Sequence, residues 1–129
     1  MPSLPVRGRS LIMAEYRFVT VWHIEAPLQR VFDAISDSLR WPDWWHGAQA
    51  VEEREAGTAD GIGSVRRYQW KSRLPYHLCF DARTTRVEPM LMLEATVSGD
   101  LEGCGRWFFS HENGVTAIRY DWHVHTRRQ

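Results

Sequence analysis

The chain has 129 residues, with 16 basic and 16 acidic side chains and therefore no formal net charge. This length is typical of one domain with its own core, since domains commonly contain about 100–150 residues. The balanced charge argues against a nucleic-acid partner, and no apolar run approaches the ~20 residues of a membrane span. The cysteines, Cys79 and Cys104, lack metal-binding spacing and favour a cytoplasmic protein with reduced thiols.

The first patterned segment begins near residue 16. Residues 1–15 are predicted to form an N-terminal tail, and residues 16–129 a single folded domain. From residue 16 to residue 25 the side chains alternate, which predicts a strand with one clearly apolar face. That face carries Tyr16, Phe18, Thr20, Trp22 and Ile24.

Two short helices are predicted after this strand. Apolar residues recur at helical spacing over residues 27–38, with Pro27 suited to the first turn. Pro42 is predicted to end this helix, and Asp43 to cap or open a second, shorter one. Three tryptophans crowd this second segment, so some must enter the core while others could cover an opening.

From residue 49 onward the chain is predicted to form β structure throughout. Segments 50–55, 64–72, 76–87 and 91–98 alternate, and residues 105–125 form a hairpin. Asn113-Gly114 marks the hairpin turn, because both residues tolerate positive φ. Short turns predict an antiparallel meander, and the whole order predicts an α+β fold with a curved seven-stranded antiparallel sheet.

Large aromatic side chains are predicted to face the concave side of this sheet and to bind a ligand there. They are Trp22, Tyr68, Trp70, Tyr76, Phe80, Trp107, Tyr120 and Trp122. Seven tryptophans in a chain of this length suit contact with a flat or bulky molecule, although a tryptophan-rich core explains them equally well. The basic residues Arg66, Arg67, Lys71 and Arg73 are expected to form one solvated strand face.

The sequence resembles the START-like (SRPBCC) helix-grip superfamily, and is closest to its polyketide cyclase, dehydrase and lipid-transport group. The stretches that carry the resemblance are YRFVTVWHIEAPLQRVFDAISD, RWPDWWHGAQAVE, GSVRRYQWKSRLPYHLCFDARTTRVEP, SGDLEGCGRWFF and YDWHVHT. Together they extend over residues 16–126. The resemblance implies a curled sheet that grips one long C-terminal helix, with a hydrophobic ligand held between them. Only residues 127–129 follow the last predicted strand, so we expect the fold without that helix.

A concave aromatic face without the helix would leave several hundred Å2 of apolar surface in water. At ~25 cal/mol per Å2, that is on the order of ten kcal/mol of lost burial. Such patches usually mark an interface, so a homodimer whose partner covers the open face is predicted. The alternative is that the tryptophan-rich segment 40–47 folds over the face instead.

Three functions fit these features. The first is binding of a hydrophobic small molecule, such as a lipid or a polyketide, and the second is a polyketide cyclase or dehydratase that folds a reactive chain by its pocket shape. The third is an interaction module whose open sheet grips a partner's helix. The sequence contains no GxSxG, HExxH, P-loop or dinucleotide motif. Because the resemblance fits both binding and catalysis, the sequence leaves enzymatic activity open.

No cofactor or metal is expected, and catalytic residues are not assigned. His23, His123 and His125 could share the outer face and bind zinc, but three solvated polar residues explain them more simply. Glu94 is an acid–base candidate, because burial in the cavity would raise its pKa. Its alternation with Leu93 and Ala95 leaves open which side it faces.

Overall fold

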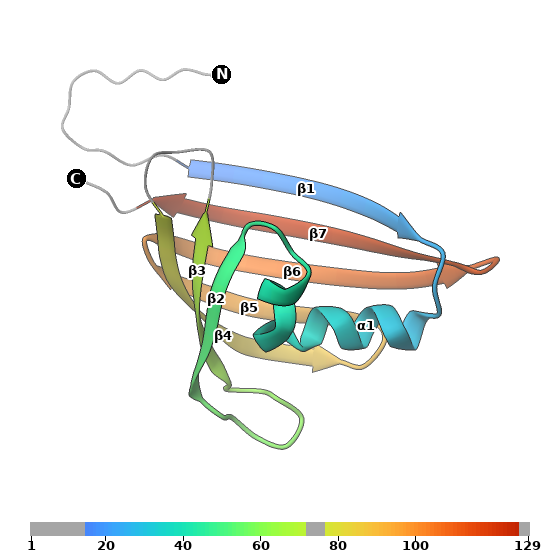
Figure 1. Ribbon diagram of the computed structural model, residues 1–129, viewed down its shortest axis with the longest axis horizontal. Helices are drawn as coiled ribbons and strands as arrows, with labels where there is room; N and C mark the ends of the chain where they lie inside the picture. The colour runs from blue at the N-terminus through green and yellow to red at the C-terminus, as the bar shows by residue number, and fades with distance from the viewer. Residues whose placement is uncertain (1–14, 72–76, 127–129) are drawn as a thin grey trace.

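The computed structural model describes residues 15–71 and 77–126, which form one curved sheet and two short helices (Figure 1). The elements are β1 (Glu15–Ile24), α1 (Leu28–Ser36), the 3-10 helix η1 (Ser38–Asp43), β2 (Ala48–Glu55), β3 (Val65–Lys71), β4 (His77–Glu88), β5 (Met92–Gly99), β6 (Leu101–Glu112) and β7 (Val115–Thr126). The expected tail lies outside the described residues except for Glu15, which opens β1.

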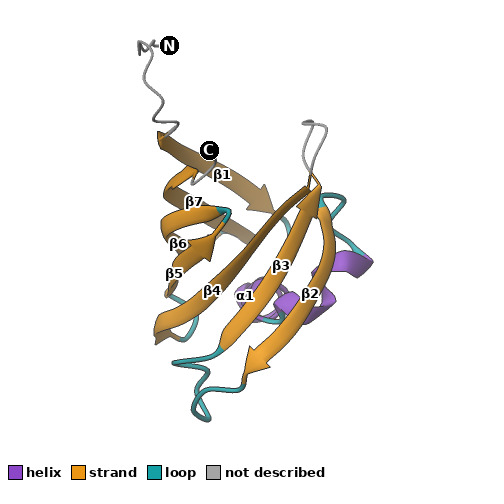
Figure 2. Ribbon diagram, turned by 90° about the vertical axis from the view of Figure 1, so that its left-hand side faces the viewer, coloured by secondary structure: helices purple, strands orange, loops and turns teal. Residues whose placement is uncertain are grey.

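The seven strands form one antiparallel sheet in the order β1-β7-β6-β5-β4-β3-β2. The predicted meander is therefore confirmed, and β1 closes it by pairing with β7. Figure 2 shows the sheet curling around α1 and η1, which both lie on its concave side. Strand twist produces this curvature and gives the sheet an inner and an outer face.

The final hairpin turns where the sequence predicts. Asn113 and Gly114 have φ values of 53° and 79°, as a tight turn between twisted strands requires. The β6–β7 register then runs unbroken from Glu112–Val115 to Leu101–Thr126. The alternation of Ile118, Tyr120 and Trp122 consequently fixes the inner face of β7.

The helical region differs from the prediction in where the first helix ends. α1 stops at Ser36, because Asp37 has a ψ of 66° and leaves the helical conformation. Pro42 does not end α1 but lies inside η1. The turn at Asp37 brings η1 back over the sheet, where Trp41 is buried.

The concave face is covered from within the chain by two tryptophans of the segment 40–47. The Trp41 ring centroid lies 4.8 Å from that of Trp45 and 5.9 Å from that of Trp107. Trp45 in turn lies 5.4 Å from Trp22 and 5.1 Å from Trp70. The structure therefore has the second arrangement considered above, in which segment 40–47 folds over the concave face. Within one chain, Trp41 and Trp45 cover the aromatic side chains that a second copy was expected to cover.

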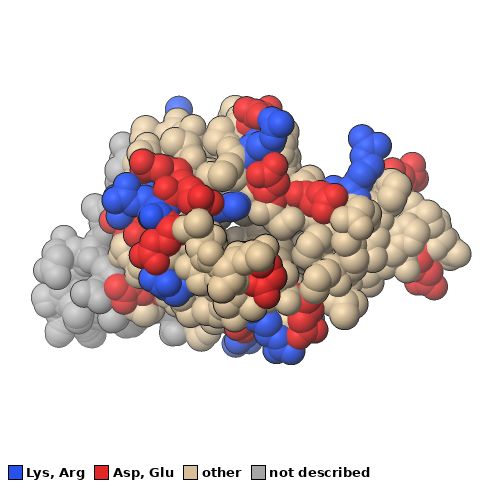
Figure 3. All heavy atoms as spheres, turned by 90° about the horizontal axis from the view of Figure 1, so that it is seen from below, with Lys and Arg blue, Asp and Glu red and all other residues tan. Residues whose placement is uncertain are grey.

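The remaining surface is mixed in charge. Figure 3 shows acidic and basic side chains interspersed over the face seen from below, with a hollow near its centre. Neither helix of the described residues is long and apolar enough to cross a membrane.

Candidate ligand-binding cavity

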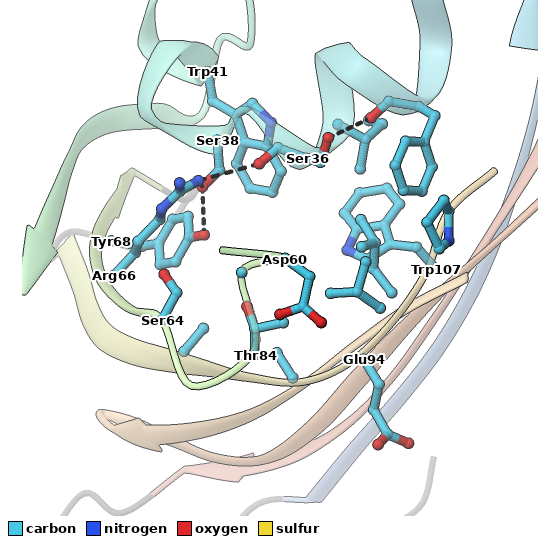
Figure 4. A pocket seen from close by; sticks show the side chains of 18 of the residues that line it. Ser36, Ser38, Trp41, Asp60, Ser64, Arg66, Tyr68, Thr84, Glu94 and Trp107 are labelled. Carbon is cyan, nitrogen blue, oxygen red and sulfur yellow. Dashed lines mark hydrogen bonds between the residues drawn. The ribbon is translucent and has the colours of Figure 1, made fainter. Parts of the chain in front are cut away.

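A cavity of about 410 Å3 lies between the α1–η1 region and strands β3 to β5 (Figure 4). Its apolar walls include Phe32 and Ile35 from α1, Trp41 from η1, and Leu93 and Trp107 from the sheet. The loop between β2 and β3 completes the lining with residues 59–61. Small-molecule sites commonly measure about 300–1,000 Å3 and have mostly apolar walls, so this cavity suits a compact ligand.

One end of the cavity is a hydrogen-bonded cluster around Arg66. Arg66 Nη1 donates to Ser38 Oγ at 2.8 Å and to the Ser36 carbonyl at 3.1 Å, and Nη2 lies 3.8 Å from Glu53. Ser38 Oγ also lies 2.7 Å from the Tyr68 hydroxyl. Nη1 therefore holds the α1–η1 junction against β3 through two hydrogen bonds.

Burial keeps the Tyr68 phenol neutral. It raises the pKa of Tyr68, although the hydrogen bond between Tyr68 and Ser38 and the charge of Arg66 partly oppose the shift. The Arg66 Nε atom is also buried and has no hydrogen-bond partner among the described residues. A buried donor without a partner is costly, and because Nε is buried it does not offer that donor to the cavity.

The loop side of the cavity carries a fixed negative charge. In Figure 4 the Asp60 carboxylate projects into the cavity, near the hydroxyls of Ser64 and Thr84. Hydrogen bonds from the Thr58 hydroxyl and the Ile62 N–H, both to Oδ1, lower the pKa of Asp60. Asp60 is therefore ionised at neutral pH, and Oδ2 remains available to accept a hydrogen bond from a ligand.

Backbone hydrogen bonds fix this loop against β4. The Gly63 N–H donates to the Thr84 carbonyl at 2.8 Å, and the Thr84 N–H donates to the Ser64 carbonyl at 2.9 Å. Gly57 has a φ of 75°, and a Cβ there would lie 2.4 Å from the Ser64 nitrogen. The close approach at Gly57 lets the loop fold back so that Asp60 points inward.

Seven of the eight residues predicted to bind a ligand are described by the structure, and all seven lie on the inner side of the sheet. They fall into two groups, those that line the cavity and those that pack beside it. Tyr68 and Trp107 line the cavity. The others belong to the packed aromatic layer beside it, namely Trp22, Trp70, Phe80, Tyr120 and Trp122. Tyr76 lies outside the described residues.

The layer is continuous with the cavity wall. Trp107 stacks on Tyr120 with a centroid distance of 3.7 Å, and Tyr120 meets Trp122 edge-on at 5.2 Å. Burial raises the pKa of Tyr120 well above its usual range. These rings therefore form a rigid apolar floor, while the polar groups that could orient a ligand stand at the two ends of the cavity.

Sequence reasoning missed Arg66 by grouping it with Arg67 in a solvated strand face. That expectation is wrong for Arg66, because alternation along β3 places it on the inner face with Tyr68. Arg67 faces outward, where its Nε donates to Asp81 at 2.8 Å. Because neighbouring side chains of a strand point to opposite faces, the sequence of β3 alone already separates Arg66 from Arg67. Ser38 and Asp60 gave no comparable signal, since a turn and a loop position them.

Of the two placements left open for Glu94, the structure has the outward one. Its carboxylate points away from the cavity in Figure 4, because Leu93 and Ala95 face inward. Hydrogen bonds from Thr85 and Arg106 lower the pKa of Glu94, whereas burial in the cavity would have raised it. Glu94 therefore belongs to a surface ion pair.

The three histidines are not gathered into a site. His23 lies opposite Ala117 in the β1–β7 register, and His125 lies 3.9 Å from Glu102. Among the described residues no group of three or more His, Cys, Asp or Glu side chains is arranged to hold a metal ion.

Replacing Tyr68 by phenylalanine tests the polar cluster. Because the phenol is buried and bonded to Ser38, we expect the free energy of unfolding to fall by about 1–2 kcal/mol. Urea unfolding followed by circular dichroism measures this loss. Tyr120→Phe is the matched control, since the Tyr120 hydroxyl makes no hydrogen bond to a described residue. Equal losses in both variants would show that the Ser38 contact contributes nothing.

Comparison with known proteins agrees with this geometry. The family described as polyketide cyclase / dehydrase and lipid transport matches residues 24–127. The chain belongs to this family. Among curated protein sequences, none is significantly similar to this member of the family.

Solved structures resemble this polyketide cyclase-family chain in fold. A START superfamily protein from Mycobacterium smegmatis has a TM-score of 0.76 at 13% identity, over 87% of this chain and 78% of that one. The ZhuI aromatase/cyclase from Streptomyces sp. R1128 has a TM-score of 0.73 at 17% identity, over 89% and 70%. Ginseng major latex-like protein 151 from Panax ginseng has a TM-score of 0.70 at 7% identity, over 88% and 80%. The TM-scores show a shared fold, and the low identities show nothing finer.

Proposed function

We propose that this chain binds a hydrophobic small molecule in the cavity between α1–η1 and strands β3 to β5. The observation that carries the proposal is the cavity of about 410 Å3, which has aromatic and aliphatic walls and a few polar groups at its ends. Membership of a family that includes lipid-transport proteins supports the same function. The free thiols of Cys79 and Cys104 fit the cytoplasmic location that we propose with it.

The polar groups indicate which kind of hydrophobic molecule fits. Asp60 offers a carboxylate oxygen to a ligand donor, whereas Arg66 already donates to Ser36 and Ser38 and lies near Glu53. A ligand carboxylate would therefore be repelled by Asp60 without gaining a free ion pair in return. We infer that the ligand is uncharged and carries a hydroxyl or similar donor.

Calorimetric titration with two naphthalene probes tests this function. We expect 2-naphthol to bind with a negative heat-capacity change, as burial of apolar surface requires, and 2-naphthoate to bind several-fold more weakly. Absence of binding by both probes and by longer apolar alcohols would contradict the proposed cavity function.

Asp60→Asn tests the source of that preference. Removing the negative charge should raise the affinity for 2-naphthoate about two- to threefold while changing that for 2-naphthol less, because Asp60 is exposed and water screens its charge. Asp43→Asn is the matched control, because this exposed carboxylate lies outside the cavity lining. An unchanged ratio of the two affinities in Asp60→Asn would show that the charge does not select the ligand.

The two alternative functions have less support. A cyclase or dehydratase would need a proton-transfer group at the ligand, but Asp60 is a weakened base and the Tyr68 hydroxyl is engaged by Ser38. A module that grips a partner's helix would need an open concave face, and Trp41 and Trp45 already occupy that face.

A further inference from the structure

The hydroxyl groups of Ser38 and Tyr68 lie together at one end of the cavity. Ser38 is 3% exposed and Tyr68 is 9% exposed, and both residues line the cavity. Their side-chain oxygens are 2.7 Å apart, so one of the two hydroxyls donates a hydrogen bond to the other. Arg66 Nη1 donates to Ser38 Oγ as well, because an arginine side chain has no acceptor.

A count of hydrogens shows that this pair has one donor left over. Each hydroxyl carries one hydrogen, and a single hydrogen bond joins Ser38 to Tyr68. If Ser38 donates to Tyr68, the phenol hydrogen has no acceptor among the described residues. If Tyr68 donates to Ser38, the serine hydrogen has none. In both cases one O–H at this end of the cavity lacks an acceptor, and a ligand can supply it.

The Arg66 donors nearest this pair are already directed elsewhere. Nη1 donates to the Ser36 carbonyl in addition to Ser38 Oγ, and Nη2 lies 3.8 Å from Glu53. The spare donor is therefore a hydroxyl, which suits a neutral acceptor such as a carbonyl oxygen. Burial raises the pKa of Tyr68, so the phenol donates without ionising at neutral pH.

The loop side of the cavity has the opposite polarity. Asp60 is ionised at neutral pH, so its Oδ2 atom accepts hydrogen bonds and cannot donate them. A ligand carbonyl oxygen placed there would face a like partial charge, whereas a ligand hydroxyl would donate to Oδ2. Figure 4 shows the Asp60 carboxylate and the Tyr68 hydroxyl on different sides of the cavity. The two sides therefore select different groups on one ligand.

We propose that the ligand is a neutral hydroxy-carbonyl compound, with a carbonyl oxygen that accepts from the Ser38–Tyr68 pair and a hydroxyl that donates to Asp60. This inference rests on the proposed function, and adds to it the acceptor group and the orientation of the ligand. An apolar group at the Ser38–Tyr68 end would leave a buried donor unpartnered, or would displace a water that satisfies it. Either loss lowers the affinity.

Calorimetric titration with two naphthols of matched size tests the acceptor group. In 6-acetyl-2-naphthol a carbonyl replaces one methylene of 6-ethyl-2-naphthol, while the rings and the hydroxyl are the same. At a pH where both are uncharged, we expect the acetyl compound to bind about tenfold more tightly, as one additional buried hydrogen bond provides. Equal affinities would overturn the inference and leave the proposed function intact. Failure of both compounds and of 2-naphthol to bind would contradict the proposed function itself.

Hydroxyl deletions at the two ends of the cavity locate the carbonyl oxygen. The double variant Ser38→Ala/Tyr68→Phe removes both hydroxyls and should abolish the preference for the acetyl compound, whereas each single variant keeps one O–H and should retain most of it. Ser64→Ala is the matched control, because it removes a buried hydroxyl from the loop side and should leave the preference unchanged.

Two results would overturn the proposed orientation. One is a preference that survives in the double variant, and the other is a preference that Ser64→Ala abolishes. Circular dichroism and binding of 6-ethyl-2-naphthol report whether the double variant is folded. If it is not, the comparison of the two naphthols in the wild-type chain and in Ser64→Ala still decides the question.

Discussion

Replacing Trp41 by alanine is expected to lower the free energy of unfolding by about 3–5 kcal/mol. Trp41 is buried to 7% exposure, and its ring contacts four other aromatic side chains of the concave layer. Its indole N–H also donates to the Ala34 carbonyl at 3.2 Å, which ties η1 to α1. The variant would lose this hydrogen bond and leave a hole between η1 and the sheet, which the rigid neighbouring rings cannot fill.

Trp44→Ala is the matched control for this prediction. Trp44 lies three residues along the same segment but is 51% exposed and touches the layer only by stacking on Trp45, so its loss should cost roughly 1–2 kcal/mol, clearly less than that of Trp41. Urea unfolding should be followed by far-ultraviolet circular dichroism, because both variants alter the tryptophan fluorescence. If the two variants lost the same stability, Trp41 would not be what closes the concave face.

The different burial of Trp41 and Trp44 shows which parts of the fold the sequence could predict and which it could not. Period-two alternation placed the inner faces of β3, β4 and β7 correctly, since the side-chain direction in a strand follows from position alone. It could not decide which of Trp41, Trp44 and Trp45 enters the core. That choice depends on the tight turn at Asp37 and the 3-10 geometry of η1, which direct Trp41 and Trp45 inward and Trp44 outward.

The candidate site was predictable only where strands form it. Tyr68 and Trp107 were found because they alternate on the inner face. Asp60 was missed because the β2–β3 loop has no periodicity, and its position depends on backbone hydrogen bonds to β4. The inward position of Arg66 was also predictable, because Arg66 and Tyr68 lie two residues apart in β3. Its charge instead favoured a place on the solvated face.

Filling the cavity should abolish ligand binding while the fold persists. Ala95 lines the cavity from β5, opposite Gly105 of β6. In Ala95→Leu, the added branched side chain would occupy space that the ligand needs, so we expect the affinity for 2-naphthol to fall at least about tenfold. Because the new atoms enter an existing void, the cost in stability should stay near or below the ~1–3 kcal/mol typical of overpacked cores.

The matched control places the same substitution on the outer face. Ala117 of β7 lies opposite His23 and outside the cavity lining, so Ala117→Leu should leave the affinity for 2-naphthol unchanged. Circular dichroism must show that both variants are folded before their titrations are compared. If Ala95→Leu bound 2-naphthol as tightly as the wild-type chain, the molecule would have to bind elsewhere. The aromatic layer around Trp122, which the sequence alone also predicted, would then be the site to test next.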